Sequence, residues 1–193
     1  STENTTSHTY TEQGIYTVIL RVKDRHNTLN STSQTLNISN VPPRCTSIER
    51  IVGDEDEPVS FYGDGFDTVS DEDILRYQWD FGDGTISTLL GMLPISHTYT
   101  QAGNYTAVMT VFDDDEDTGQ CHVNVTIRNI LPELELEIST DNVYEDDMVE
   151  FKGSGTDTDS DEDDLVYRIN FGDGNDTDWQ DEADFSHSYN LSG

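Results

Sequence analysis

The residues of this chain that could do chemistry are chiefly its aspartates, which gather in a few short segments. The 193 residues include 40 acidic and 9 basic ones, for a formal charge of -31. The carboxylates cluster at 54–57, 71–73, 113–117 and 157–164, whereas the outward positions of the strand-like segments carry mostly Thr, Asn, Gln and Ser. A surface adapted to high salt would spread its carboxylates over the strands as well. Clustering therefore favours the binding of divalent cations.

Two other sets of polar residues resemble catalytic groups, and their repetition argues against that interpretation. Asp83 and Asp173 stand in Phe-Gly-Asp-Gly turns, where Asp caps the turn and Gly accepts a positive φ. His97 recurs as His8 and His187, with no second His, Cys or nucleophilic Ser in a fixed arrangement beside it. An array of identical active sites would be unusual. We expect both sets to be architectural, and the chain not to be an enzyme.

A repeat of about 90 residues runs through the chain and predicts its fold. Ser-His-Thr-Tyr at 7–10 returns at 96–99 and, as Ser-His-Ser-Tyr, at 186–189, while Phe-Gly-Asp-Gly at 81–84 returns at 171–174. Between these anchors, apolar and polar residues alternate over short runs such as 103–111 and 123–127, which predicts β-strands and little helix. Units of this size with six or seven strands are typical of immunoglobulin-like β-sandwiches. The predicted fold class is all-β.

Three motifs follow one another in the central unit: Trp-Asp-Phe-Gly-Asp-Gly at 79–84, His-Thr-Tyr at 97–99 and Gly-Asn-Tyr-Thr at 103–106. This ordered set resembles the PKD (polycystic kidney disease) domain family. The resemblance implies tandem sandwiches similar to fibronectin type III and immunoglobulin domains, of a kind common in archaeal and bacterial surface proteins. The third unit departs from the motif, with Ile169 and Asn170 in place of Trp79 and Asp80.

The repeat divides the chain into three parts. Residues 1–41 hold the last strands of a first PKD-like unit, residues 42–131 a complete unit, and residues 132–193 the first part of a third. A half sandwich has an open edge and an unfilled core, so its missing strands must come from elsewhere. Either the natural chain continues in both directions, or the leading strands of one copy complete the trailing unit of its neighbour, head to tail. Both alternatives stay open at this point.

The sandwich prediction brings several acidic loops to one end of each unit. There the loop between the second and third strands, the loop before the final strand and the amino-terminal linker meet, offering the oxygen ligands that calcium prefers. The candidate ligands are Asn40, Asp67, Asp71, Asp73, Asp113 and Asp115 for the central unit, and Asn129, Asp157, Asp159, Asp161 and Asp163 for the third. Calcium there would stiffen the junctions, as in cadherin-like arrays. A solvated acidic loop is the alternative.

Two features point to an extracellular or cell-surface location. Cys45 opens the first strand of the central unit and Cys121 its last, so we expect a disulfide if these strands run side by side. Acceptor sequons for N-linked glycans begin at Asn4, Asn30, Asn37, Asn104, Asn124, Asn175 and Asn190. No apolar run reaches the about 18 residues that would insert into a membrane, so any signal or anchor lies outside this window.

Charge and motifs together favour a structural function. The acidic excess disfavours nucleic acid, whose phosphates need clusters of Lys and Arg. The leading hypothesis is a repetitive array of modules in a cell-surface layer, stalk or filament, in contact with further repeats or copies of itself. One alternative, implied by the resemblance, is a set of accessory modules that dock or space a large secreted hydrolase. Another is an adhesive or mechanosensing ectodomain.

Overall fold

The computed structural model describes residues 5–47, 49–89, 91 and 94–190, and strands dominate them. The chain divides into two compact units. The first comprises Ser1–Ile51, Ser60–Ile95 and Tyr105–Asn124, and the second comprises Val52–Val59, Ser96–Asn104 and Val125–Gly193. The sequence predicted three parts, 1–41, 42–131 and 132–193. Each described strand pairs only with strands of its own part.

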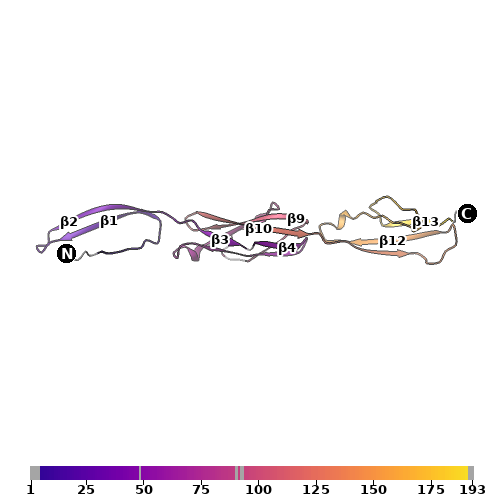
Figure 1. The fold of residues 1–193 in the computed structure, drawn as a ribbon, viewed down its shortest axis with the longest axis horizontal. Helices are drawn as coiled ribbons and strands as arrows, with labels where there is room; N and C mark the ends of the chain where they lie inside the picture. The colour runs from indigo at the N-terminus through magenta and orange to yellow at the C-terminus, as the bar shows by residue number, and fades with distance from the viewer. Residues whose placement is uncertain (1–4, 48, 90, 92–93, 191–193) are drawn as a thin grey trace. The chain divides into compact units, whose positions relative to one another are not determined.

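The first part is a long antiparallel hairpin of β1 (Gly14–Lys23) and β2 (Leu29–Ile38), shown in Figure 1. Pairing runs from Gly14 opposite Ile38 to Lys23 opposite Leu29. The Asp24 carboxylate closes the turn by accepting backbone N–H groups two and four residues on, each at 2.8 Å. Apolar side chains of both faces of β1 are exposed, so this hairpin carries no core of its own.

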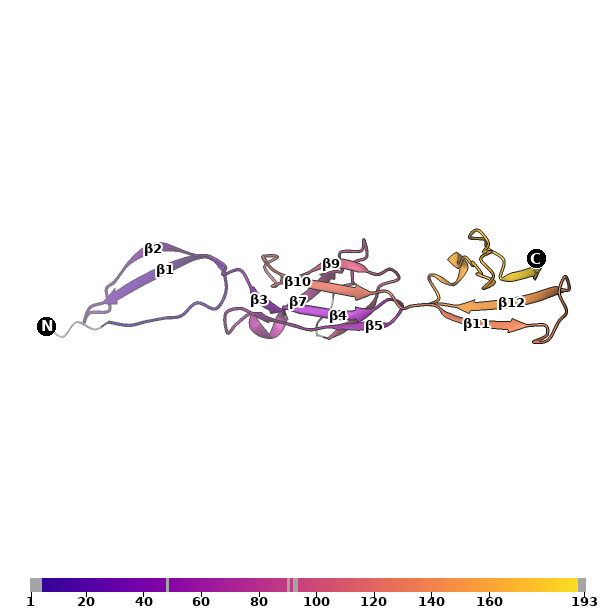
Figure 2. The ribbon, with the colours of Figure 1, turned by 45° about the vertical axis from the view of Figure 1, so that its right-hand side comes forward.

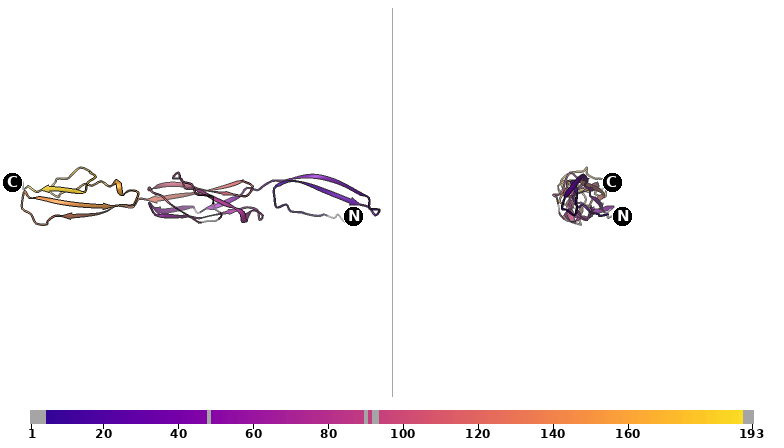
Figure 3. Two further views of the ribbon diagram at one scale, coloured as in Figure 1. Left: turned by 180° about the vertical axis from the view of Figure 1, so that it is seen from behind. Right: turned by 90° about the vertical axis from the view of Figure 1, so that its left-hand side faces the viewer.

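The described residues of the central part form eight strands and one short 3-10 helix. Figure 3 shows the ribbon from behind. The elements are β3 (Arg44–Ser47), β4 (Arg50–Asp54), β5 (Pro58–Phe61), β6 (Gly63–Phe66), η1 (Glu72–Ile74), β7 (Arg76–Asp80), β8 (Ile95–Thr98), β9 (Gly103–Phe112) and β10 (Thr118–Arg128). Strand order is β4-β10-β9-β7 in one sheet, with β3 paired to β6 and β5 to β8. These antiparallel strands confirm the all-β, immunoglobulin-like prediction.

The core of the central part follows the predicted alternation. Every second residue of β9 from Ala107 to Val111 is buried, as are Val123, Val125 and Ile127 of β10. The Phe61 ring lies 5.0 Å from the rings of both Trp79 and Phe81. The alternation of apolar and polar residues therefore predicts correctly which face of each strand is buried, because successive side chains of a strand point to opposite faces.

A disulfide joins Cys45 to Cys121, with their Cα atoms 6.0 Å apart. The backbones also approach closely here: a side chain at Gly119 would place its Cβ atom 2.3 Å from the carbonyl oxygen of Pro43. Glycine is required at this position because only it lets the start of β10 pass the linker into β3.

The third part contains β11 (Glu133–Ile138), β12 (Met148–Thr156), η2 (Glu162–Asp164) and β13 (Asp184–Ser188), in sheet order β11-β12-β13, as Figure 2 shows. The segment equivalent to β7 makes isolated bridges instead, from Tyr167 to Gln180 and from Asn170 to Asp176. The buried cluster is small and consists of Val149, Phe151 and Ile169. Ile169 thus keeps the apolar position that Trp79 occupies in the central part.

Candidate functional site

The linker into the central part is fastened to the turn between β9 and β10. The Asn40 side-chain amide donates to the carboxylates of Asp113 at 2.8 Å and Asp117 at 3.0 Å. Asp113 is only 1% exposed, and its second oxygen accepts the backbone N–H of Asp117 at 2.8 Å. The predicted meeting of linker and turn is therefore present, with Asp117 as a partner that the sequence prediction did not include.

Asp67, which follows β6, belongs to the same group of charges. One carboxylate oxygen accepts the N–H of Thr68 at 2.7 Å, while the other is buried without a hydrogen-bond partner among the described residues. Burial raises the pKa of Asp67 above its ordinary value, and the negative charges of Asp71, Asp113 and Asp114 raise it further. A half-buried carboxylate with one oxygen buried beside other carboxylates suits a cation, because a cation would offset both the loss of solvation and the repulsion between the charges.

Not all predicted ligands of the central part share this position. Asp71 is buried and accepts the Thr68 hydroxyl at 2.8 Å, whereas Asp73 is exposed on η1 and Asp115 is half-buried in the β9–β10 turn. Within the described ranges, no group of three or more His, Cys, Asp or Glu side chains is arranged to hold a metal ion by itself. Any cation here would need backbone, amide or water oxygens as well.

The acidic loop of the third part lies against the turn between β4 and β5. The Asp56 carboxylate accepts both the backbone N–H of Ser160, at 2.9 Å, and its hydroxyl, at 2.6 Å, and these bonds lower the pKa of Asp56. Burial raises the pKa of Asp161 above its ordinary value. The negative charges nearby raise it further, in the order Glu55, Asp157, Asp56 and Asp164. The other predicted ligands do not join this group: Asp159 and Asp163 are exposed, and the Asn129 amide donates to the Ile130 carbonyl at 2.6 Å.

Glu55 has a structural role that the sequence prediction missed. Its side chain is 1% exposed, and its two carboxylate oxygens accept the backbone N–H groups of Ala102, at 3.0 Å, and Ile130, at 2.8 Å. A buried carboxylate that satisfies two N–H groups ties the β8–β9 turn to the following linker. Recurrence could have revealed it, because Glu-Asp at 55–56 returns at 145–146 with the aspartate at positive φ both times, 57° and 68°.

The recurring His and Asp residues form a latch in the third part. The His187 ring stacks on Phe171, with centroids 4.1 Å apart, and its Nε2 atom lies 2.7 Å from the Asp173 carboxylate. The Tyr189 hydroxyl donates to the Phe171 carbonyl at 3.0 Å. These contacts tie β13 to the Phe-Gly-Asp-Gly turn and give the recurring residues an architectural role.

This latch predicts a shifted titration. The hydrogen bond from His187, with help from Asn175, lowers the pKa of Asp173 to about 2 from its ordinary value of 3.8. The latch should thus be intact above pH 4 and lose its contribution to stability as the pH falls from about 4 to 2. We expect a carboxyl NMR titration midpoint near 2 for Asp173, and a higher midpoint in His187→Phe, which keeps a ring against Phe171 and leaves only the Asn175 hydrogen bonds to lower the pKa. A wild-type midpoint near 3.8 would rule out the latch.

The sequon asparagines lie at exposed positions wherever the structure describes them. Asn30, Asn37, Asn104, Asn124, Asn175 and Asn190 are exposed, and Asn4 lies outside the described residues. The Asn104 carboxamide accepts the hydroxyl of Thr126, at 3.0 Å, from the neighbouring strand. Glycosylation stays a prediction, and none of the described sequon side chains is buried.

Comparison with known families decides the identity of the central part. Residues 40–128 match the model of the PKD domain. Residues 40–128 are a PKD domain. The PKD match begins at the Asn40 linker and ends at the last residue of β10, so it contains the linker, the β9–β10 turn and Asp67.

Relatives of this PKD domain occur in proteases. The chain is 38% identical over 79 residues to the pre-pro-metalloprotease PrtV of Vibrio cholerae, and 29% identical over 93 residues to the collagenase ColA of Bacillus cereus. These alignments cover 40% and 48% of this chain but only 8% of each protease.

Among solved structures, the PKD domain of an M14-like peptidase from a Thermoplasmatales archaeon aligns with a TM-score of 0.40 at 20% identity. The alignment covers 46% of this chain and 98% of that one. Among the described residues, no helix is long and apolar enough to cross a membrane.

Proposed function

We propose that this chain is a non-catalytic string of PKD-type modules in an extracellular structural protein, a surface layer, stalk or filament, with calcium stiffening its junctions. The observation that carries the proposal is the linker contact. Asn40 binds the buried Asp113, and the unpartnered oxygen of Asp67 lies in the same group of negative charges. A cation here would hold the linker against two loops of one sandwich.

Calcium suits this group better than other cations. The candidate ligands are carboxylate, amide and backbone oxygens, which calcium binds in flexible geometry with about six to eight ligands. Softer metals select His and Cys, and the two cysteines are joined in the disulfide. Asp67, Asp71 and Asp113 would supply the negative charge. The side-chain oxygen of Asn40 would be a further ligand, because both hydrogen bonds to Asp113 and Asp117 are made by the side-chain nitrogen.

Calcium is expected to raise the melting temperature of the central PKD domain. At about 100 times the Kd, binding to the folded state alone adds about 2.7 kcal/mol to the free energy of unfolding. Asp67→Asn should abolish this gain, yet melt higher than wild type in chelator, because it removes one charge from a repelling group. Asp64→Asn, an exposed residue on β6, is the matched control and should keep the calcium effect. Differential scanning calorimetry with calcium or chelator tests this, and equal melting temperatures in wild type would reject the calcium site.

An extracellular location is supported by the chemistry of the chain. A disulfide persists in oxidising compartments, and the described sequons are exposed to solvent. Related PKD domains belong to a pre-pro-metalloprotease and a collagenase. Mass spectrometry of native material should find glycans on sequon peptides; bare peptides at every sequon would remove that part of the proposal.

A second candidate function is suggested by those relatives: accessory modules that dock or space a secreted hydrolase. Docking onto a polymer needs an exposed aromatic side chain, and Trp179 is 66% exposed. Co-sedimentation with insoluble collagen and chitin separates the two candidates. If the chain is purely structural, wild type and Trp179→Ala should bind the polymers equally weakly. If wild type binds and Trp179→Ala does not, the docking function is favoured.

A further inference from the structure

The Cys45–Cys121 disulfide joins two sheets of the central PKD domain. Cys45 lies in β3, which pairs with β6, whereas Cys121 lies in β10 of the four-stranded sheet β4-β10-β9-β7. Both cysteines are half-buried, so solvent reaches the bond. The bond therefore fixes the start of β3, and the linker before it, to a second sheet.

The linker and the β9–β10 turn both lie close to this bond along the chain. Asn40 stands five residues before Cys45, and Asp117 stands four residues before Cys121. The Asn40 side-chain amide donates to the carboxylates of Asp117 at 3.0 Å and Asp113 at 2.8 Å. With the disulfide closed, these hydrogen bonds complete a short ring of residues 40–45 and 117–121. A short ring costs less conformational entropy to close than a long one.

Proline and glycine leave this ring little freedom. Pro42 and Pro43 lie in the linker, where their side-chain rings fix the φ angles, and Pro43 is buried. On the other side of the ring, a Cβ atom at Gly119 would stand 2.3 Å from the Pro43 carbonyl oxygen, so the two backbones are in close contact. A displacement at the disulfide would therefore also displace the linker.

The loop after β6 has a second support. Cys45 lies opposite Gly65 in the β3–β6 ladder, and Asp67 follows two residues later. Gly65 is itself buried, and a Cβ atom there would stand 2.9 Å from side-chain atoms of both Leu75 and Val111 in the core. Core packing thus holds this loop whether or not the disulfide is closed. The part of the site that depends on the disulfide is the linker.

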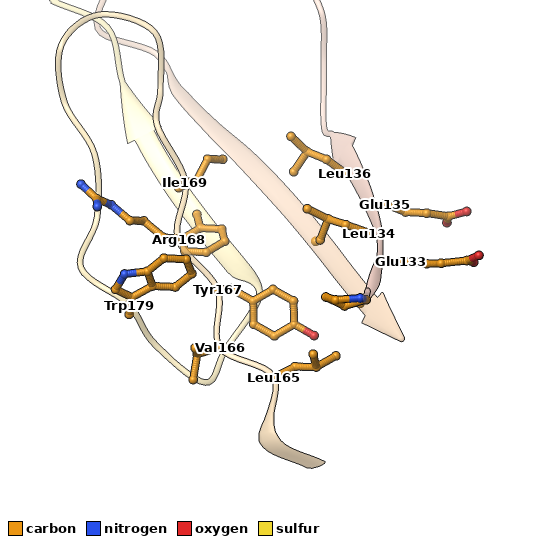
Figure 4. A pocket seen from close by; sticks show the side chains of 14 residues that line it. Glu133, Leu134, Glu135, Leu136, Leu165, Val166, Tyr167, Arg168, Ile169 and Trp179 are labelled. Carbon is orange, nitrogen blue, oxygen red and sulfur yellow. The ribbon is translucent and has the colours of Figure 1, made fainter. Parts of the chain in front are cut away.

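The third part has an equivalent ladder and contains no cysteine. Leu134 lies opposite Gly155 there, as Cys45 lies opposite Gly65. Its side chain points into an apolar pocket, which Figure 4 shows, between β11 and the 165–169 segment. The acidic loop at 157–164 is therefore an internal reference that reduction of the disulfide should leave unchanged.

We propose that the disulfide is a redox-sensitive lock on the linker. While it is closed, Asn40 stays bound to Asp113 and Asp117. A dithiol reductant opens it: the S–S bond breaks, each cysteine sulfur takes up a hydrogen, and the dithiol becomes a disulfide. β3 has only four residues, and Cys45 is the second of them, so the start of the strand frays once it is unfastened and the linker leaves the turn.

A consequence for calcium rests on the proposed function. Asn40 is a candidate ligand, so an unfastened linker would have to be ordered again on binding, and the calcium affinity should fall. The coupling is reciprocal: calcium should make the disulfide harder to reduce by the same factor. A tenfold change in affinity corresponds to a reduction potential lower by about 30 mV.

Backbone nitrogen-15 relaxation in chelator tests the lock without calcium. We expect an order parameter of about 0.85 for Asn40 in the oxidised chain, as for a rigid backbone, and less than about 0.6 after reduction by a dithiol. Asp67 and the 157–164 loop should keep their values, because other contacts hold them. An Asn40 order parameter that reduction leaves unchanged would overturn the proposal.

A second variant keeps the disulfide and the stability that it gives. A Gly-Gly-Gly-Gly segment inserted between Val41 and Pro42 makes the path from Asn40 to the bond longer and flexible. The Asn40 order parameter should then fall below about 0.6 although the disulfide is closed. The same insertion between Arg25 and His26, in the β1–β2 turn, is the matched control and should leave Asn40 rigid. If Asn40 stays rigid in the first insertion variant, the disulfide does not hold the linker.

Calorimetric titration with calcium separates the lock from the proposed calcium site. The Kd should be at least about tenfold higher in the Cys45→Ser, Cys121→Ser double variant and in the linker insertion variant than in the oxidised chain. If all three bind equally tightly, the calcium site stands and its redox control is refuted. If the oxidised chain binds no calcium, the calcium site and its redox control are both refuted, and the order parameters alone decide whether the lock exists.

Discussion

Removing the Cys45–Cys121 disulfide is expected to lower the free energy of unfolding of the PKD domain by about 4 to 5 kcal/mol in the chain-entropy model. The bond closes a loop with a sequence separation of 76 residues and links the strands at the two ends of the domain. Breaking it frees the unfolded chain far more than the folded one, since β3 and β10 remain held by their own sheets.

Urea denaturation of the Cys45→Ser, Cys121→Ser double variant measures this loss. Reduced wild type is the control and should unfold like the double variant, while the oxidised protein unfolds at higher urea. Two free thiols labelled in the native, unreduced protein would contradict the disulfide. An unchanged free energy of unfolding in the double variant would contradict its stabilising role.

Trp79→Ala is expected to cost about 3 to 5 kcal/mol, the usual price of truncating a buried aromatic side chain. Trp79 is fully buried and packs 5.0 Å from the Phe61 ring. Its indole N–H has no hydrogen-bond partner among the described residues, so the loss comes from packing and apolar burial. Its backbone N–H is held by the Ser87 hydroxyl at 2.9 Å, a bond that the substitution leaves in place.

The other tryptophan provides the control for this core prediction. Trp179 is 66% exposed, so Trp179→Ala should change the free energy of unfolding by less than about 0.5 kcal/mol. Chemical denaturation followed by circular dichroism compares the two variants. Equal costs, or a Trp79→Ala variant as stable as wild type, would contradict the assignment of Trp79 to the core.

The strands and the core could be predicted from the sequence because a strand records its buried face in a period of two. Met109 and Val111 are buried, while Asn104 and Thr106 of the same strand point outward, as alternation requires. The recurring Phe-Gly-Asp-Gly turn likewise predicted an architectural role from local chemistry, and the latch from His187 to Asp173 gives that role a structural basis.

The site was less predictable, because it depends on contacts between distant segments. Glu55 stands in an acidic cluster, yet its carboxylate accepts two N–H groups from distant segments, the β8–β9 turn and the linker after β10. Asp71 and Asp73 are two residues apart, but only Asp71 is buried, because η1 places Asp73 at the solvent-exposed surface. Counting carboxylates in a loop shows where charge gathers, whereas tertiary contacts decide which carboxylates face one another.

The most direct test of the central claim is to measure whether calcium makes the β1–β2 hairpin and the central PKD domain move as one. Residual dipolar couplings report the alignment of each part separately. We predict one shared alignment tensor in calcium and two different tensors in chelator, with Asp67→Asn showing two in both. Two tensors in calcium, or one shared tensor that chelator leaves unchanged, would contradict a calcium-stiffened junction.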